Sequence, residues 1–311
     1  MEIRQLRHFV AAAEAGNLRK ASESMNITHP ALSMSIKNLE TNLGVKLLDK
    51  GRSGVEMTYA GQQFLKSAHS LLRQIDDLQA SMKGNEDSPT GKVRLGIPYG
   101  LNNSLAAPFF KILSEKFPGI DLEIEEGNTT SLGKLYESGS IDLMINYDVV
   151  EKMDRKCEPL YEEKLYFVSA YDPVLKDIEE MDLKDLSDLP IVCSPGTNAM
   201  RTTLERYAFE HKVRFNFLPD FQSAHASIKI AEAGLANTIS PWDEVQDQVS
   251  AKMVTARRIE NPSINRTICL ISSLRGMPSR AVGIVVGVIK EAMELARKED
   301  RLRGEPVVDK V

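Results

Sequence analysis

The first 43 residues carry the pattern that most constrains this chain. Apolar residues recur at helical spacing, and together with the capping residues Asn17 and Thr28 they predict helices over residues 3–15, 18–25 and 29–43. Two short helices joined by a tight turn, the second led by small polar residues, form a helix-turn-helix. The second helix of this motif enters the major groove of DNA. An ordinary three-helix subdomain with solvated polar faces is the alternative.

The third predicted helix has one buried side and one outward side. Leu32, Ile36 and Leu39 form its buried stripe. Pro30 falls in the first turn, where the missing N–H of proline costs nothing. The outward positions are candidates for contact with base edges and nearby phosphates. They are Thr28, His29, Ser33, Met34 and Lys37.

A basic loop follows the three helices. Residues 46–48 and 55–57 flank a glycine-containing loop at residues 49–54, and this arrangement predicts a winged hairpin. At its tip Arg52, with Ser53 beside it, would reach phosphates or a narrow minor groove. A solvated basic loop is the alternative.

Net charge divides the chain near the same place. The whole chain carries −5, but residues 1–73 hold ten lysines and arginines against six acids, which leaves −9 for residues 74–311. A basic head on an acidic body predicts a polyanion as the partner of the head alone.

Thr58 is suited to cap a long helix that reaches about residue 83. The apolar residues of this helix alternate at spacings of four and three, which predicts that two chains pair through it as a coiled coil. Packing of the helix on its own body is the alternative. Residues 84–91 form a hinge by composition. The predicted dimerisation residues are Leu65, Ala68, Leu72, Ile75 and Met82.

Strand and helix patterns alternate through the rest of the chain, which predicts a body of two α/β lobes with a cleft between them. We expect lobe I over about residues 92–161 and 267–303 and lobe II over about residues 162–266. Residues 304–311 are expected to form a charged, frayed tail.

Two polar loops lie where a predicted strand passes into a helix, at residues 99–104 and 194–198. Free backbone N–H groups, with hydroxyls and amides at a helix start, suit a carboxylate or a similar anion. Plain turn-and-cap chemistry is the alternative for each loop. Their equivalent places in two lobes favour a ligand site in the interlobe cleft.

The head resembles the LysR-type transcriptional regulators. The matching residues are 21–33, 39–40, 43–45, 47–48 and 58–61. The body resembles the effector domain of that family, so the resemblance covers nearly the whole chain. The matching residues there are 117–118, 139–142, 232–235 and Pro241. A weaker likeness, carried by residues 95–97, Gly100 and residues 146–147, is to the nitrogen-assimilation-control branch.

The resemblance implies a winged helix-turn-helix, a linker helix that pairs two chains, and a two-lobed sensor like the periplasmic binding proteins, commonly assembled as a dimer of dimers. It implies DNA contact at Thr28, Pro30, Ser33 and Arg52. Met34-Ser35 replaces the polar or basic pair of many members, so no base preference is transferred. It implies a cleft lined by Gly100, Leu101, Asn102, Asn103, Asn128, Thr129, Tyr147, Ser194, Thr197, Asn198 and His225.

Together these features predict a sequence-specific DNA-binding regulator of transcription in the cytoplasm, with RNA polymerase as an indirect partner and no cofactor. No lysine or arginine lies in the two polar loops, so we expect a small polar or singly anionic effector there. Control by abundance alone, with no effector, is the alternative.

Three other classes of protein are disfavoured. The sequence holds no GxSxG, GxGxxG, P-loop or HExxH motif, and its five histidines are scattered, which argues against an enzyme. A solute-binding protein would share the body fold, but the N-terminus shows no signal-peptide pattern. A thiol switch needs a reactive cysteine, whereas Cys193 and Cys269 lie in apolar strand patterns.

Overall fold

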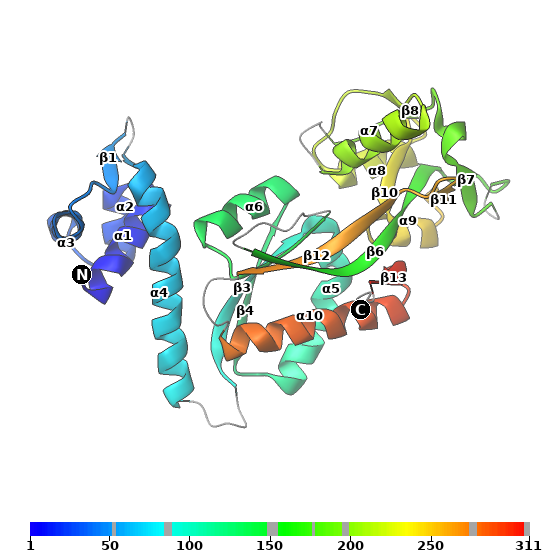
Figure 1. Cartoon of the computed structure of the whole chain (residues 1–311). Coiled ribbons are helices and arrows are strands. Elements are labelled where there is room, and N and C mark those ends of the chain that lie inside the picture. The colour runs from blue at the N-terminus through cyan, green and yellow to red at the C-terminus, as the bar shows by residue number, and fades with distance from the viewer. Residues whose placement is uncertain are drawn as a thin grey trace.

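The computed structural model describes residues 1–51, 54–83, 89–147, 155–175, 178–194, 199–273 and 279–307. Figure 1 shows a helical head, one long helix beside it, and an elongated α/β body. The head and each lobe of the body have their own core of buried apolar side chains. None of the described helices is both long enough and apolar enough to cross a membrane.

The head contains the three predicted helices and the predicted hairpin. Asn17 caps α2, because its side-chain oxygen accepts hydrogen bonds from the N–H groups of Arg19 at 2.9 Å and Lys20 at 3.2 Å. Thr28 caps α3 by accepting from the N–H of Ala31 at 3.4 Å. The elements are α1 (Ile3–Ala15), α2 (Leu18–Ser24), α3 (His29–Leu43), β1 (Leu48–Lys50), β2 (Val55–Met57) and α4 (Tyr59–Lys83).

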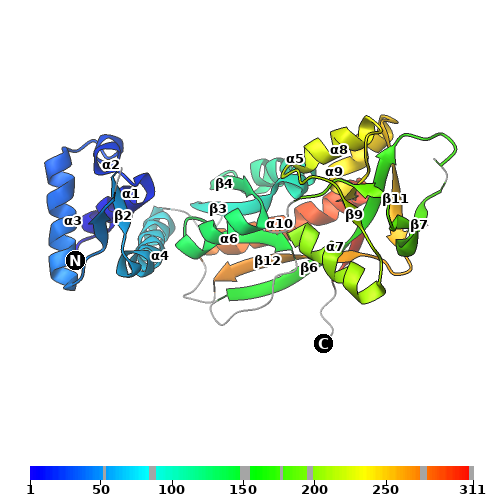
Figure 2. The same ribbon diagram turned by 90° about the horizontal axis from the view of Figure 1, so that it is seen from above.

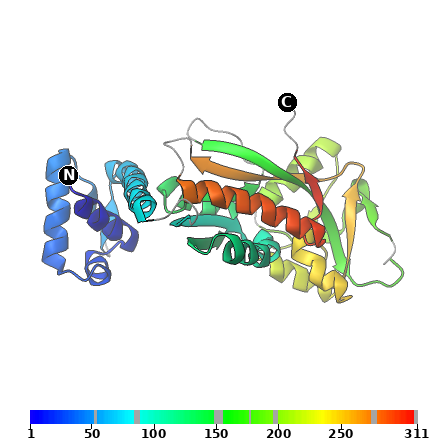
Figure 3. The same cartoon turned by 90° about the horizontal axis from the view of Figure 1, so that it is seen from below.

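Lobe I is a sheet in the order β4-β3-β5-β12-β6, with helices on both faces. Helices α5 and α10 pack on one face over the largest core, and Figure 3 shows α10 lying across it. Helix α6 covers the other face around Leu132 and Met144. The elements are β3 (Gly91–Pro98), α5 (Tyr99–Lys116), β4 (Ile120–Gly127), α6 (Thr129–Ser138), β5 (Leu143–Tyr147), β6 (Arg155–Ala170), β12 (Asn265–Ser273) and α10 (Arg280–Lys298).

Lobe II is built on the continuation of β6. This strand pairs with β12 over residues 155–164 and with β10 and β11 over residues 165–170, so it runs through both lobes. The other elements are β7 (Glu180–Asp182), the 3-10 helix η1 (Leu183–Leu186), β8 (Pro190–Ile191), α7 (Ala199–His211), β9 (Asn216–Phe217), α8 (Ala224–Glu232), β10 (Thr238–Pro241), α9 (Trp242–Ser250) and β11 (Val254–Glu260).

Some boundaries differ from the sequence predictions. Residues 99–104 form the start of α5 rather than a loop, because Pro98 serves as the N-cap and the helix begins directly after β3. Helix α9 was not predicted, since its nine residues hold only three apolar side chains. The predicted tail at residues 304–311 begins with β13 (Gly304–Pro306), which pairs with β6. The hydroxyl of Tyr161 donates to the carbonyl oxygen of Gly304 at 2.8 Å and holds this strand.

Candidate nucleic-acid interface and interlobe cavity

Helix α3 lies at the outer edge of the head and presents its N-terminal half to solvent (Figure 2). Leu32 and Leu39 are fully buried and anchor the opposite side of the helix in the head core. The structure therefore leaves the predicted contact residues of α3 accessible. Thr28, His29, Pro30, Met34 and Lys37 are exposed, and Ser33 is half-buried.

Ser35 faces away from this surface. Its hydroxyl lies 2.7 Å from Nδ1 of His8, a buried side chain of α1, and this contact ties α3 to α1. Burial, together with the nearby Arg4 guanidinium, lowers the pKa of His8, so the ring is uncharged at neutral pH. Of the Met34-Ser35 pair, only Met34 is presented to a ligand.

The hairpin β1–β2 is antiparallel, as predicted, and its tip residues Arg52 and Ser53 lie outside the described residues. The base of the hairpin is fixed to the turn between α1 and α2, where the N–H of Val55 donates to the carbonyl oxygen of Gly16 at 2.9 Å. A Cβ on Gly54 would stand 2.2 Å from the same oxygen, so this close approach requires glycine.

Part of the predicted dimerisation stripe on α4 is covered by the head itself. Leu65 and Ala68 are buried in the head core and cannot face a second chain, which corrects their assignment. Leu72 packs against the same core. Beyond Tyr59 at its start, the large apolar side chains that the described part of α4 exposes are Leu71 and Leu78, which are 40% and 63% exposed and lie two turns apart.

The first part of the heptad pattern on α4 thus follows the alternative, in which the helix packs on its own chain. Such a pattern records that one face of a helix is buried, and it does not record what buries it. Here α1 covers the first half of the stripe, with the Phe9 and Phe64 rings in edge contact at 5.2 Å between centroids. Ile75 is half-buried, and the side chain of Met82 lies outside the description.

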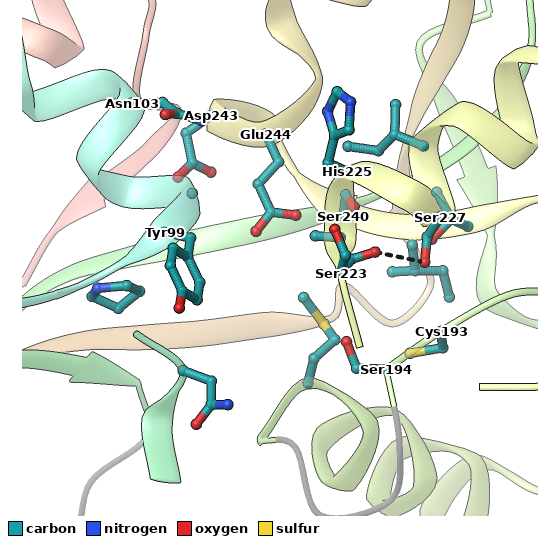
Figure 4. A pocket seen from close by; sticks show the side chains of 18 of the residues that line it. Tyr99, Asn103, Cys193, Ser194, Ser223, His225, Ser227, Ser240, Asp243 and Glu244 are labelled. Carbon is teal, nitrogen blue, oxygen red and sulfur yellow. Dashed lines mark hydrogen bonds between the residues drawn. The ribbon is translucent and has the colours of Figure 1, made fainter. Parts of the chain in front are cut away.

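A cavity of about 670 Å³ lies between the lobes, beside the carboxyl ends of β3, β4 and β5 (Figure 4). Helices α5, α6, α8 and α9 all begin at its wall. The structure brings together many of the residues that the sequence assigned to one cleft. Those that line the cavity are Gly100, Asn103, Asn128, Thr129, Tyr147, Ser194 and His225.

Leu101 and Asn102 do not line the cavity. Because α5 begins at Tyr99, neighbouring side chains in this segment point in different directions around the helix. Leu101 points into the core of lobe I, and the side chain of Asn102 donates to Glu126. Thr197 and Asn198, the other predicted residues, lie outside the described residues.

Much of the wall comes from residues that the sequence did not single out. Arg266 comes from β12, and Asp243 and Glu244 come from the first turn of α9. Ser223 caps α8, and Ser227 lies within that helix. No local motif marks them, since they meet only when β6, β10 and β12 pair. The two predicted loops contain no lysine or arginine, but the cavity does have arginines at its wall, namely Arg266 and Arg301.

Arg266 is a buried charge at the floor of the cavity. It is 5% exposed, pairs with Glu163 at 2.5 Å, and lies 3.6 Å from the centre of the Tyr147 ring. Burial opposes the charge of Arg266, but Glu163 together with Tyr147, Glu244 and Asp243 outweighs this effect and raises the pKa of the guanidinium above its ordinary value. Arg266 therefore stays charged, and its charge is balanced by Glu163.

Two acids of α9 border the same space. Glu244 lies against α5, where a Cβ on Gly100 would stand 2.6 Å from its Cγ, so a larger residue at this position would require the Glu244 side chain to move. Asp243 is 4% exposed, and within the described structure neither of its carboxylate oxygens accepts a hydrogen bond from another residue. Burial, followed by the charges of Glu163 and Glu244, raises the pKa of Asp243 well above its usual range.

Cys193 also lines the cavity, next to Ser194 (Figure 4). Burial raises the pKa of its thiol to about 11, so little thiolate forms at neutral pH. Cys269 is buried in the sheet and Cys157 is half-buried. These surroundings favour a packing role for Cys193 over a reactive one.

Two family models match the chain. Residues 3–62 match the bacterial regulatory helix-turn-helix protein of the lysR family, and residues 86–294 match the LysR substrate binding domain. The chain belongs to the LysR family. It is a LysR-type transcriptional regulator with a helix-turn-helix head and an effector-binding body, and its curated relatives are regulators rather than enzymes.

Two curated relatives of this LysR regulator illustrate a match over nearly the full length of both chains. The nitrogen assimilation regulatory protein nac of Klebsiella aerogenes is 23% identical over 97% of this chain and 98% of its own, in agreement with the weaker likeness seen in the sequence. A hydrogen peroxide-inducible genes activator of Haemophilus influenzae is 24% identical over 94% of this chain and 99% of its own.

Solved structures share the fold of the whole chain. A full-length OxyR variant from Pseudomonas aeruginosa has a TM-score of 0.79 at 20% identity and covers 100% of this chain and 99% of its own. CbnR, a LysR family regulator solved in complex with its target DNA, has a TM-score of 0.55 at 20% identity and covers 94% of this chain and 100% of its own. At these identities the likeness shows the fold alone.

The buried carboxyl of Asp243 should make stability depend on pH. Because its pKa is higher in the folded than in the unfolded chain, stability falls as pH rises from about 4, the ordinary aspartate value, toward the folded value. Asp243→Asn cannot ionise. Its free energy of unfolding should therefore fall less between pH 5 and pH 8 than that of the parent does, as measured by urea unfolding at several pH values.

Asp247→Asn is the control for this experiment, because it removes an exposed carboxyl from the same helix. Its pH dependence should follow that of the parent. If Asp243→Asn also follows the parent, the carboxyl of Asp243 is not held in the environment described.

Proposed function

We propose that this LysR regulator binds a promoter element of dyad symmetry as a homodimer or as a tetramer of two dimers. The exposed N-terminal half of α3, held on a packed head, carries this proposal, since it has the form of a helix that enters a major groove. Two such helices about 34–36 Å apart would reach successive grooves. The target-DNA complex of CbnR supports this mode of binding by analogy.

Pairing of two chains is assigned to α4. Leu71 and Leu78 supply its exposed apolar surface, and the remaining apolar side chains of the described stripe serve the head core or lie half-buried. Promoter binding places the protein in the compartment that holds the DNA, which we take to be the cytoplasm. RNA polymerase is then an indirect partner, reached through the promoter.

The interlobe cavity is assigned a small polar effector that alters how the heads meet DNA. Such a ligand acts only if it binds two assembly states with different affinity. Helix α6 connects the two places: Thr129 at its start lines the cavity, and a Cβ on Gly139 at its end would stand 3.3 Å from Cβ of His69 on α4. Control by abundance alone remains the alternative, and a thermal-shift screen in which no metabolite stabilises the protein would support it.

Lys37→Ala should weaken binding to all DNA sequences alike, because an exposed lysine beside the base-reading positions neutralises a phosphate. The slope of log affinity against log salt concentration should become less steep by about 1. Fluorescence anisotropy with a promoter duplex and an unrelated duplex, at several salt concentrations, measures both effects. Lys111→Ala removes the same charge from an exposed site on α5 and should leave the slope unchanged. An unchanged slope in Lys37→Ala would remove Lys37 from the interface.

A double substitution, Leu71→Glu with Leu78→Glu, should shift the assembly toward smaller species. It places charges on the proposed α4 interface, where burial without a partner is strongly unfavourable. Sedimentation velocity measures the change, and DNA affinity should fall with it although the head is untouched. Leu235→Glu, at a residue of lobe II that is 75% exposed, is the control and should assemble as the parent does. If the double variant keeps the parent's size, α4 does not hold the dimer.

A further inference from the structure

The cavity of this LysR regulator contains a buried acid that the protein leaves unsatisfied. Asp243 stands in the first turn of α9 and borders the cavity (Figure 4). It is 4% exposed, and no other described residue donates a hydrogen bond to either carboxylate oxygen. A buried carboxylate without a partner is costly, because it has lost water and gained nothing in exchange.

The charges around Asp243 do not balance it. Both arginines at the cavity wall already face carboxylates, since Arg266 pairs with Glu163 at 2.5 Å and Arg301 with Glu299 at 3.2 Å. Asp243, Glu244 and Asp247 add three further acids to the wall. With these acids ionised, the described wall and the carboxylates paired with its arginines together carry an excess of negative charge.

Helix starts at the cavity do not explain this excess. Acids in a first turn are favoured by the helix dipole, and this accounts for their presence on α9. It does not account for the burial of Asp243, because an acid gains the same benefit at an exposed site. The starts of α6 and α8 are already capped, by the side chains of Asn128 and Ser223, and Glu244 lies against the first turn of α5. An incoming anion would meet two helix starts that are already capped and the three acids of α9.

A metal ion is a poorer match than an organic cation. Among the described residues no group of three or more histidine, cysteine, aspartate or glutamate side chains is placed to hold a metal ion. A protonated amine needs fewer ligands, since it carries its own charge and up to three N–H donors. The cavity, at about 670 Å³, has room for an amine attached to a small organic body.

We propose that the effector of this protein is a small molecule with a protonated amino group, bound by the carboxylates of Asp243 and Glu244; this rests on the proposed role of the cavity as the effector site. The opposite wall suits the rest of such a molecule. It offers the hydroxyls of Ser194, Ser223 and Ser227 and the ring of His225, and Figure 4 shows these groups across the cavity from Asp243. Without a ligand, the raised pKa of Asp243 means that a proton takes the place of the amine.

The test uses the full chain and four compounds with the same four-carbon backbone: 1,4-diaminobutane, 4-aminobutanoate, 1,4-butanediol and butanedioate. The diamine and the amino acid should raise Tm by about 2 °C or more at saturation, whereas the diol and the dianion should not. Asp243→Asn should lower amine affinity at least about tenfold by calorimetry, since a charge-assisted bond is lost. Amine binding to the parent should release protons near pH 7, and binding to Asp243→Asn should not.

Glu115→Gln is the matched control, because it removes one negative charge from an exposed site at the far end of α5. It should bind the amines as the parent does. Promoter binding by each variant, without added compound, shows that the fold and the proposed regulatory function are intact.

The outcomes separate the two proposals. Any one of three results overturns the amine effector. Butanedioate stabilises the protein as much as the diamine or more, neither amine stabilises it, or Asp243→Asn binds the amines with unchanged affinity. If promoter binding is normal in any of these cases, the regulator assignment stands. Loss of promoter binding in the parent, with Asp243-dependent amine binding retained, overturns the proposed function and leaves the amine site in place.

Discussion

The ion pair between Arg266 and Glu163 is the interaction on which the body depends. The two residues face each other in the register of β12 and β6, and both are almost fully buried where these strands pass from lobe I into lobe II. Removing one partner of such a pair leaves an unpaired charge buried in the interior, which lowers the stability of the fold by about 3–5 kcal/mol. The pair, with the Tyr147 ring against it, therefore holds the crossing strands in one register and forms the cavity floor.

Features set by short stretches of chain could be predicted from the sequence. Asn17 and Thr28 cap the helices that were expected after them, because a cap bonds only to N–H groups two or three residues ahead. The buried stripe of α3 is confirmed for the same reason, since helical spacing decides which side chains share a face. The polar segment at 99–104 was placed at the cavity, but its conformation was wrong because Pro98 starts a helix there.

Features set by distant parts of the chain could not be predicted. Leu65 and Ala68 have the spacing of a coiled-coil stripe, and only the folded head shows that α1 covers them. Asp243 and Arg266 lie in segments with no motif, and strand pairing brings them to one wall. The expectation of a small polar or singly anionic effector was drawn from two loops alone, whereas the charge of a cavity is a sum over elements that no single loop reveals.

The chain passes from lobe I into lobe II and returns at neighbouring residues, because Lys164 of β6 faces Asn265 of β12. Its cores draw only on residues 165–264, and the main core of lobe I contains none of these. In chain topology, lobe II is thus an insertion into lobe I whose two ends lie side by side. A short turn between the two strands would close lobe I without it, leaving a one-lobed body that keeps its sheet and the contact of α6 with α4 but has no enclosed space.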